Sequence, residues 1–444
     1  MDENSSLQEE TKEKDNEKRT KKGKAWRYVL ATLLALVCFV GGGLTTWYAI
    51  LDDEVRSLVR MKSRIDREYY EDISDEEFYD VVFDAVSEKL LDKYSTYYSA
   101  EEYAAVKSSG EGNKSGLGVG LDTSDDKMLV VEVYGNSPAE NAGVRLGDYI
   151  VAFGKTQTDM TESGKFDDLS AFLQTLDDNA KFSLRVIRKG EPVLLTACKS
   201  KYVENYVYYR TNEISYTFTG KDALHLTAGE NVLSVLDDDT AYIRLASFNG
   251  NAAKQFGLAM DEFRVDGKKN LVLDLRGNGG GYLDIMQEIA SYFCKSAQEL
   301  HPVVAVAKYG NGKREEFAAS GNFYRRYFTS ESRICVLADN NTASAAECLI
   351  GCMVDYGATT YADICLISRG GVAKTFGKGI MQTTYLLSPV KKDAVKLTTA
   401  KIYWPISNNC IHSRGVLVED GTKVALEDYA TVDSELIAAI KTLF

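Results

Sequence analysis

The chain contains the stretch Leu271-Val272-Leu273-Asp274-Leu275-Arg276-Gly277-Asn278-Gly279-Gly280-Gly281. Its first five residues form an apolar run of the length of a buried strand, and the glycines give a tight turn into a helix expected near Tyr282. Similar short runs occur at residues 241–245 and 334–338. Strands that alternate with helices predict a mixed α/β core, which we place at residues 201–444.

The glycine turn offers backbone N–H groups at the start of a helix. Such groups bind phosphate or stabilise an oxyanion. The turn lacks the Gly-Lys-Ser/Thr ending of a phosphate loop, and the dinucleotide pattern G-x-G-x-x-G is absent here. These absences disfavour a nucleotide enzyme. A purely structural turn is the remaining alternative.

A second stretch, residues 341–347, places Ser344 at the expected start of a helix. A serine hydroxyl is a weak nucleophile unless a neighbouring base takes its proton. The chain has three histidines, none in a recognisable site motif. A lysine is therefore the natural base, and Lys378, between two glycines in residues 375–382, is the best placed candidate.

Ser344 also has a purely structural interpretation, because Ser344-x-x-Glu347 fits a capping box. Asn341 and Thr342 can cap the helix equally well, which would leave Ser344 in the first turn. There the helix dipole and the N–H of Ala345 would favour developing negative charge.

Lys378 and Gln382 are four residues apart and share a face in either a helix or a strand. A lysine has an ordinary pKa of about 10.4, so a catalytic lysine must be neutralised by burial. Phe376, Ile380 and Met381 could supply the apolar surroundings, and Gln382 could hold the amine without adding charge. The alternative for any single lysine is a solvated surface residue.

Residues 111–200 contain two motifs in a fixed order. A glycine loop at residues 116–121 has Gly118, Val119 and Gly120 at its centre, and a string of Ser-Pro-Ala, Ala-Gly and Gly-Asp follows at residues 137–148. Together they resemble a PDZ domain, with the glycine loop matching the carboxylate-binding loop of that family. A PDZ domain captures the carboxyl terminus of a peptide that adds a strand to its sheet. The alternative is a glycine hairpin without a ligand.

The charge distribution separates the amino-terminal part from the rest. The 444 residues carry a net charge of −13, which argues against a nucleic-acid partner. Residues 18–27 are basic, and residues 28–51 contain no charge. We expect a cytoplasmic, disordered tail at 1–27, a single-pass transmembrane helix at 28–51 with the catalytic part outside the cytoplasm, and a helical segment at 52–110. A cleaved signal peptide is the competing interpretation.

Eight cysteines are present, one of them within residues 28–51. The remaining seven cannot all pair within one chain. No C-x-x-C spacing occurs, which argues against a zinc site or thioredoxin chemistry. We expect neither a metal nor another cofactor.

Taken in order, these motifs resemble the carboxyl-terminal processing peptidase family, from about residue 54 to 444. The matching segments are residues 91–97, the PDZ segment, and residues 242–248, 274–281, 342–347, 354–357, 375–382, 397–400 and 414–416. The resemblance implies a serine endopeptidase with an inserted PDZ domain, acting on proteins or peptides with accessible carboxyl termini.

Carried over by position, the resemblance implies a role for each site residue. Ser344 would be the nucleophile, Lys378 the general base and Gln382 the residue that orients it. The N–H groups of Gly280 and Ala345 would form the oxyanion hole. An aspartate at position 355 would pack beneath the site, and a homo-oligomer or an adaptor partner would be compatible with the family.

One departure from the family is a longer connection before Thr375, with residues 361–371 as the apparent insertion. This insertion could shift Lys378 or act as a lid. The alternative function is therefore a catalytically inactive, PDZ-bearing scaffold that binds peptides without cleaving them.

Overall fold

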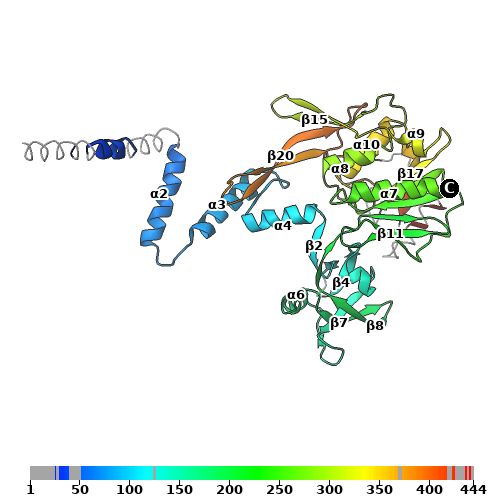
Figure 1. Ribbon diagram of the computed structural model, residues 1–444, viewed down its shortest axis with the longest axis horizontal. Coiled ribbons are helices and arrows are strands. Elements are labelled where there is room, and N and C mark those ends of the chain that lie inside the picture. Colours follow the sequence, from blue (N-terminus) through cyan, green and yellow to red (C-terminus); the bar gives the residue numbers. More distant parts are fainter. Residues whose placement is uncertain are drawn as a thin grey trace, which may run out of the picture. The chain divides into compact units, whose positions relative to one another are not determined.

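The computed structural model describes residues 26, 30–39, 52–123, 127–368, 373–417, 423–425, 436–437 and 440–441 (Figure 1). The chain divides into two compact units, Met1–Val86 and Ser87–Phe444. The expected tail at 1–27 lies almost wholly outside the described residues. Residues 30–39 are helical, whereas the rest of the expected membrane segment, 28–29 and 40–51, is outside them. Along the described residues we find no helix with the length and apolarity needed to cross a membrane.

The first unit contains two of the expected helices. They are α2 (Asp53–Glu68) and most of α3 (Asp75–Leu90). The N–H of Glu77 donates to Ser74 Oγ at 3.1 Å, as a capping serine requires. Lys62, buried on α2, pairs with Asp75 at 2.8 Å. A third helix, α4 (Ala100–Gly110), belongs to the second unit and begins at a Ser99 capping box.

Residues 111–200 form a small domain with a core of its own. Its described strands make one sheet, in the order β3 (Val119–Asp122), β4 (Met128–Val133), β5 (Tyr149–Gly154), β7 (Lys181–Arg188) and β8 (Glu191–Cys198), with β6 (Thr161–Glu162) on β5. Its helices are α5 (Pro138–Ala142) and α6 (Phe166–Gln174). A ribbon of β2 (Asn113–Gly116) and β9 (Ser200–Val203) leads into and out of this domain.

The larger domain is built on a mixed sheet of eight described strands. In spatial order they are β12 (His225–Ala228), β11 (Ser215–Thr219), β10 (Val207–Arg210), β13 (Thr240–Leu245), β14 (Asn270–Asp274), β17 (Ile334–Asp339), β18 (Ile364–Ser368) and β21 (Lys423–Ala425). The pairs from β13 to β21 are parallel. The three strands expected from the apolar runs are all central strands of this sheet, which confirms the α/β core.

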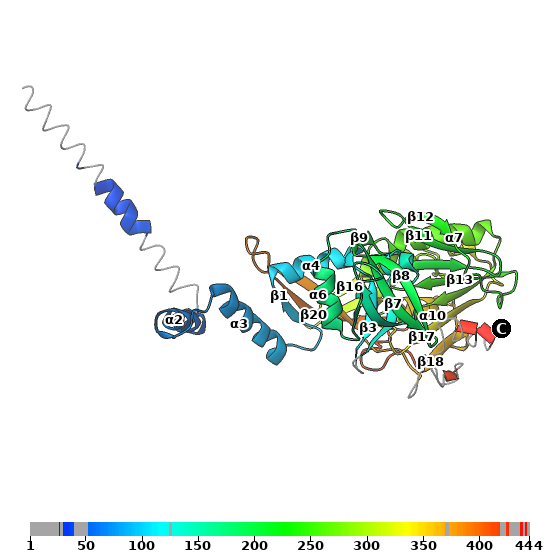
Figure 2. The ribbon, with the colours of Figure 1, turned by 90° about the horizontal axis from the view of Figure 1, so that it is seen from below.

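Helices cover one face of this sheet. They are α7 (Ala252–Val265), α8 (Leu283–Ala290), α9 (Tyr324–Tyr327) and α10 (Ala345–Asp355), and Figure 2 shows α7 alongside β11 and β13. Alternate residues of β14 divide between the faces: Leu271 and Leu273 pack in the main core, and Val272 packs in a second cluster on the opposite face with Leu436 and Ile440. Two buried faces explain why these strands are apolar throughout rather than alternating.

A second sheet carries the lysine region. Its described strands are β1 (Thr96–Tyr98), β20 (Ala394–Tyr403), β15 (Val303–Tyr309) and β16 (Arg314–Ala318), with β19 (Ile380–Leu386) also paired to β20. Ala305 and Ile402 of this sheet join the main core beside α10. The segment of Lys378 thus meets α10 across one continuous apolar interior.

Two expectations about the region after α10 are wrong. Residues 361–368 of the apparent insertion are not a lid, because they form a 3₁₀ turn and then β18, a buried strand of the central sheet. Residues 369–371 lie outside the described residues. Asp355 does not pack beneath the site: it ends α10, about 16 Å of helix from Ser344, and accepts the N–H groups of Ile406 and Ser407 at 2.8 and 2.9 Å.

Candidate active site

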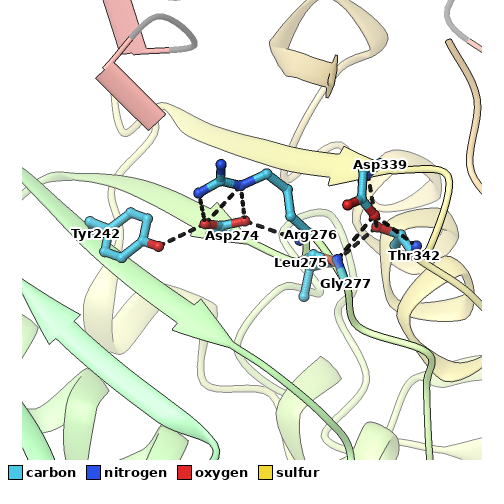
Figure 3. Close-up of polar contacts among 7 residues, drawn as sticks. All are labelled: Tyr242, Asp274, Leu275, Arg276, Gly277, Asp339 and Thr342. Atoms are coloured by element: carbon cyan, nitrogen blue, oxygen red, sulfur yellow. Dashed lines mark hydrogen bonds and ion pairs between the residues drawn. The ribbon is translucent and has the colours of Figure 1, made fainter. Parts of the chain in front are cut away.

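Two loops meet at the carboxyl ends of the adjacent parallel strands β14 and β17 (Figure 3). Asp339 Oδ1 accepts the N–H of Gly277 from the first loop and the N–H of Thr342 from the second, both at 3.0 Å. The Thr342 hydroxyl donates back to the carbonyl of Leu275 at 2.8 Å. These bonds fix the glycine turn against the turn that carries Ser344. The carboxyl ends of parallel strands are where α/β folds place their sites.

A buried ion pair supports the base of the first loop. Arg276 donates from Nε and Nη2 to the carboxylate of Asp274 at 2.5–3.0 Å, and the Tyr242 hydroxyl donates to the same carboxylate at 2.7 Å. Burial alone would raise the pKa of Asp274, but the charge and hydrogen bonds of Arg276 hold that pKa below its ordinary value. The pair therefore stays ionised inside the protein (Figure 3).

Ser344 occupies the N-cap of α10, immediately before the first helical residue. The expectation of a place within the first turn is wrong by one residue. The φ angle of Ser344 is +58°, which a residue with a side chain rarely adopts. Strained backbone of this kind concentrates at functional positions. The half-buried serine is thus held on a sharp strand-to-helix turn.

Glu347 links Ser344 to the segment of Lys378. Its side chain is fully buried, and its Oε2 accepts the N–H of Ser344 and the N–H of Lys378, both at 2.9 Å. Its Oε1 accepts the N–H of Gly377 at 2.8 Å and the hydroxyl of Thr375. Burial raises the pKa of Glu347, and these four donors oppose that rise. The capping box predicted only the bond to Ser344.

Gly280 and Ala345, the expected oxyanion donors, lie together beside Ser344. A Cβ atom on Gly280 would stand 2.7 Å from Ser344 Cβ and 2.9 Å from the nitrogen of Ala345. The N–H of Ala345 belongs to the first turn of α10, where no intrahelical acceptor exists. The N–H of Gly280, however, donates to Asn278 Oδ1 at 2.9 Å. In this state one of the two expected donors is already bonded inside its own loop.

Lys378 lies in the loop before β19, and its Nζ stands 5.2 Å from the centre of the Tyr94 ring. Its pKa is lowered, mainly by burial and further by the charge of Lys396, while Asp92 acts in the opposite direction. The lysine is therefore not a solvated surface residue. A pKa that burial lowers is what a lysine base needs, whereas the face of the Tyr94 ring attracts the charged form of the amine.

Gln382 does not bond to Lys378. Its Nε2 donates to the carbonyl of Tyr94, so Tyr94 contacts the lysine through its ring and the glutamine through its backbone. Among the described residues there is also no hydrogen bond between Ser344 Oγ and Lys378 Nζ. The structure thus places the serine and the lysine on one network, through Glu347, without direct contact of their reacting atoms.

Tyr94 and the wider role of Glu347 were not predicted as site features. Tyr94 lies within residues 91–97, a segment that matched the family, and this match was the available signal for its place. Among the described residues, no cluster of three or more histidine, cysteine or acidic side chains could hold a metal ion. The cysteines are free thiols, most of them buried.

The glycine loop of the small domain lines a cavity of about 510 Å³. Gly118 has a φ of +85° and precedes β3, which begins at Val119 and contains Gly120. The carbonyls of Leu117 and Gly118 accept hydrogen bonds from within the domain, at 2.8 and 3.1 Å. β3 is the end strand of its sheet, so an extended peptide has a free edge to join.

Two family models match parts of this chain. Residues 239–419 match peptidase family S41, and residues 115–197 match a PDZ domain. The carboxy-terminal processing protease CtpA of Bacillus subtilis is 26% identical over 380 residues, covering 85% of this chain and 71% of that protein. The carboxyl-terminal-processing protease of a Synechocystis species is 26% identical over 362 residues, covering 79% and 73% respectively.

A solved structure gives the same fold. A Bacteroides fragilis protein described as an S41 protease matches with a TM-score of 0.50 at 18% identity, covering 85% of this chain and 98% of its own. At this identity the likeness concerns the fold alone.

Proposed function

We propose that this chain, which belongs to peptidase family S41 and is a serine-type peptidase with a PDZ domain, is a membrane-anchored endopeptidase for exported proteins or peptides. Ser344 is the proposed nucleophile and Lys378 the proposed general base. The PDZ domain captures the carboxyl terminus of the substrate. The uncharged segment at 28–51 is the proposed anchor, with the peptidase outside the cytoplasm.

One observation carries the proposal for the catalytic pair. The buried carboxylate of Glu347 bonds the backbone of Ser344 and the backbone of Lys378 through the same oxygen. Two segments that are 34 residues apart in sequence are thereby held against each other. A glutamate that only capped α10 would not need to accept the N–H of Lys378 as well.

The proposed reaction uses the lysine in its neutral form. Because burial lowers the pKa of Lys378, a larger fraction of its amine is neutral than for an exposed lysine. That amine takes the proton of Ser344 as Oγ attacks the scissile carbonyl, and later gives it to the leaving amine. Water then hydrolyses the acyl-enzyme, with Lys378 again accepting a proton.

The developing oxyanion is stabilised by backbone N–H groups in this proposal. The N–H of Ala345 sits at the positive end of α10. The N–H of Gly280 joins it when it exchanges Asn278 Oδ1 for the oxyanion. Gln382 acts through Tyr94, since its amide bonds the Tyr94 carbonyl while the lysine lies over the Tyr94 ring.

The direct test compares three forms of the full chain in detergent: wild type, Ser344→Ala and Lys378→Ala. We expect both variants to lose cleavage of an unfolded protein such as reduced casein by at least about 10³-fold, while they keep the melting temperature of the wild type within a few degrees. Undiminished cleavage by either variant contradicts the assigned roles. Peptide binding without cleavage by the wild type, up to pH 10, would instead establish the inactive scaffold.

A further inference from the structure

Tyr202 contributes a hydroxyl group to the glycine loop of the PDZ domain. It lies on β9, which follows the segment that matches the PDZ family at residues 115–197. Its oxygen lies 2.8 Å from the position that a Cβ atom on Gly118 would take. Tyr202, Gly118 and Val119 all line the 510 Å³ cavity. A residue from outside the matched domain thus reaches the loop.

The Tyr202 hydroxyl is free to bind a ligand. Within the part of the chain that the structure describes, it has no hydrogen-bond partner. Burial raises its pKa well above the ordinary value, so the group remains a protonated donor. The neighbouring Ser137 hydroxyl differs, because it already accepts the N–H of Glu140 at 3.0 Å.

The charges around Tyr202 include both signs. Glu132 and Glu204 lie near enough to raise its pKa. Lys114 stands 3.5 Å from the Glu204 carboxylate and 5.5 Å from the centre of the Tyr134 ring, and it lines the same cavity. Burial raises the pKa of Glu204 as well. The positive charge of Lys114 thus offsets the negative charge of the Glu204 carboxylate next to the cavity.

We propose that the Tyr202 hydroxyl donates a hydrogen bond to the terminal carboxylate of a peptide bound at the Gly118 loop. The inference rests on the proposed capture of carboxyl termini by the PDZ domain, and it adds a side-chain hydrogen-bond donor to that binding site. Backbone N–H groups of the loop and the phenol converge on one carboxylate, whose two oxygens accept several donors. A charge-assisted bond of this kind distinguishes a free carboxyl terminus from an internal peptide segment.

The other residues that line the cavity indicate which kind of side chain the last residue of the peptide can have. Six of the lining residues are apolar: Leu117, Val119, Leu121, Phe166, Leu169 and Leu173. A terminal aliphatic residue such as valine can bury its side chain among them. A peptide that ends in valine is therefore a suitable ligand with which to test the Tyr202 contact.

The position of Tyr202 also ties this contact to the peptidase domain. β9 pairs with β2 along Lys114–Tyr202, and two residues later the N–H of Glu204 donates to the carbonyl of Gly112 at 2.9 Å. Gly112 in turn packs on Gly250, just before α7. A peptide held by Tyr202 would touch the strand that joins the two domains.

The test measures peptide affinity in a form that cannot cleave. The full chain carrying Ser344→Ala, in detergent, is titrated by fluorescence anisotropy with a fluorescein-labelled decapeptide ending in valine, as the free acid and as the amide. We expect the free acid to bind more tightly. Adding Tyr202→Phe should weaken binding of the acid about tenfold and leave the amide unchanged. Tyr149→Phe, a tyrosine of the same domain outside the cavity, is the matched control, and melting curves confirm folding.

Two outcomes would overturn the inference. One is equal affinity of the Tyr202→Phe form and its parent for the free acid. The other is an equal loss for acid and amide, which would show that Tyr202 only holds the loop in shape. The binding assay uses the Ser344→Ala form and does not depend on cleavage. Either outcome therefore leaves the proposed catalysis to be tested by the cleavage assay.

Discussion

The backbone N–H groups of Ser344 and Lys378 share one acceptor, Oε2 of Glu347, at 2.9 Å each. The serine precedes α10, and the lysine follows α10 and one further strand, β18, so only a tertiary contact can fix their separation. A buried carboxylate suits this task because it accepts up to four hydrogen bonds. All four donors found here point at it from the two segments.

Glu347→Gln should lower both stability and activity. All four bonds to Glu347 use its oxygens as acceptors, so the NH₂ group of glutamine would face two donors. Unsatisfied buried donors cost about 1–3 kcal/mol each. We expect the free energy of unfolding to fall by about 2–4 kcal/mol and kcat to fall by at least tenfold, measured by urea unfolding and casein cleavage. Glu316→Gln, on an exposed ion pair, should change neither. Wild-type kcat in the Glu347→Gln form would contradict the shared-acceptor argument.

Gly280→Ala should abolish most of the activity, whereas Gly279→Ala should not. Gly280 has a φ of +98°, and a Cβ atom there would lie 2.7 Å from Ser344 Cβ. The glycine loop must therefore move away from the serine. Loss of one oxyanion donor lowers kcat by about 10²–10³-fold. At Gly279 a Cβ atom meets nothing within 4 Å, so this neighbour is the matched control. An equal loss of activity in the two variants would contradict the role proposed for Gly280.

Activity should rise with pH, because the lysine base works in its neutral form. The pKa of Lys378 is lowered by burial and by Lys396, and raised by Asp92. The ascending limb of kcat/KM against pH should therefore lie below the ordinary lysine value. Removing the positive charge in Lys396→Gln should move this limb to higher pH, and removing the negative charge in Asp92→Asn should move it to lower pH. A profile that falls above neutrality while the protein stays folded would contradict a lysine base.

Arg276→Ala should destabilise the fold strongly at neutral pH. It leaves the Asp274 carboxylate buried with its main charge partner gone, which costs about 3–5 kcal/mol. In the wild type the pKa of Asp274 is lowered, so its contribution is present above the unfolded value of 3.8 and is lost as the pH falls through the lower, folded value. The difference in the free energy of unfolding between wild type and variant should thus become smaller towards acid pH. Urea unfolding at several pH values checks this.

The control for Arg276→Ala is Arg185→Ala, which breaks a more exposed pair with Glu162. Such pairs contribute less than about 1 kcal/mol. If the two substitutions cost the same, burial is not what makes the Asp274 pair important.

Local patterns predicted those parts of the fold that depend on neighbouring residues. The apolar runs at 241–245, 271–275 and 334–338 are β13, β14 and β17, because strands buried on both faces are apolar throughout. Helix α10 ends before Gly357, whose φ of +68° suits the residue after a helix. Gly280 lies beside Ser344, and its role as an oxyanion donor stays a prediction.

The predictions that failed depend on contacts between residues that are far apart in the sequence. β18 was taken for an insertion because only its spacing was compared, although Ile364–Ser368 is itself an apolar run. The bond from Gln382 to Tyr94 spans 288 residues, and no periodicity can predict it. Tertiary bonds occupy Asp339 and Thr342, through the N–H of Gly277 and the carbonyl of Leu275, so the Thr342 hydroxyl is not available to cap α10, and Ser344 stands at the N-cap.

The anchoring of the lysine segment by Glu347 has a consequence for how such a chain can tolerate change. Thr375, Gly377 and Lys378 are all held from α10, so the length of the connection that precedes them is not what sets their position. A change in α10 that displaces Glu347 would therefore shift the lysine segment together with the turn of Ser344.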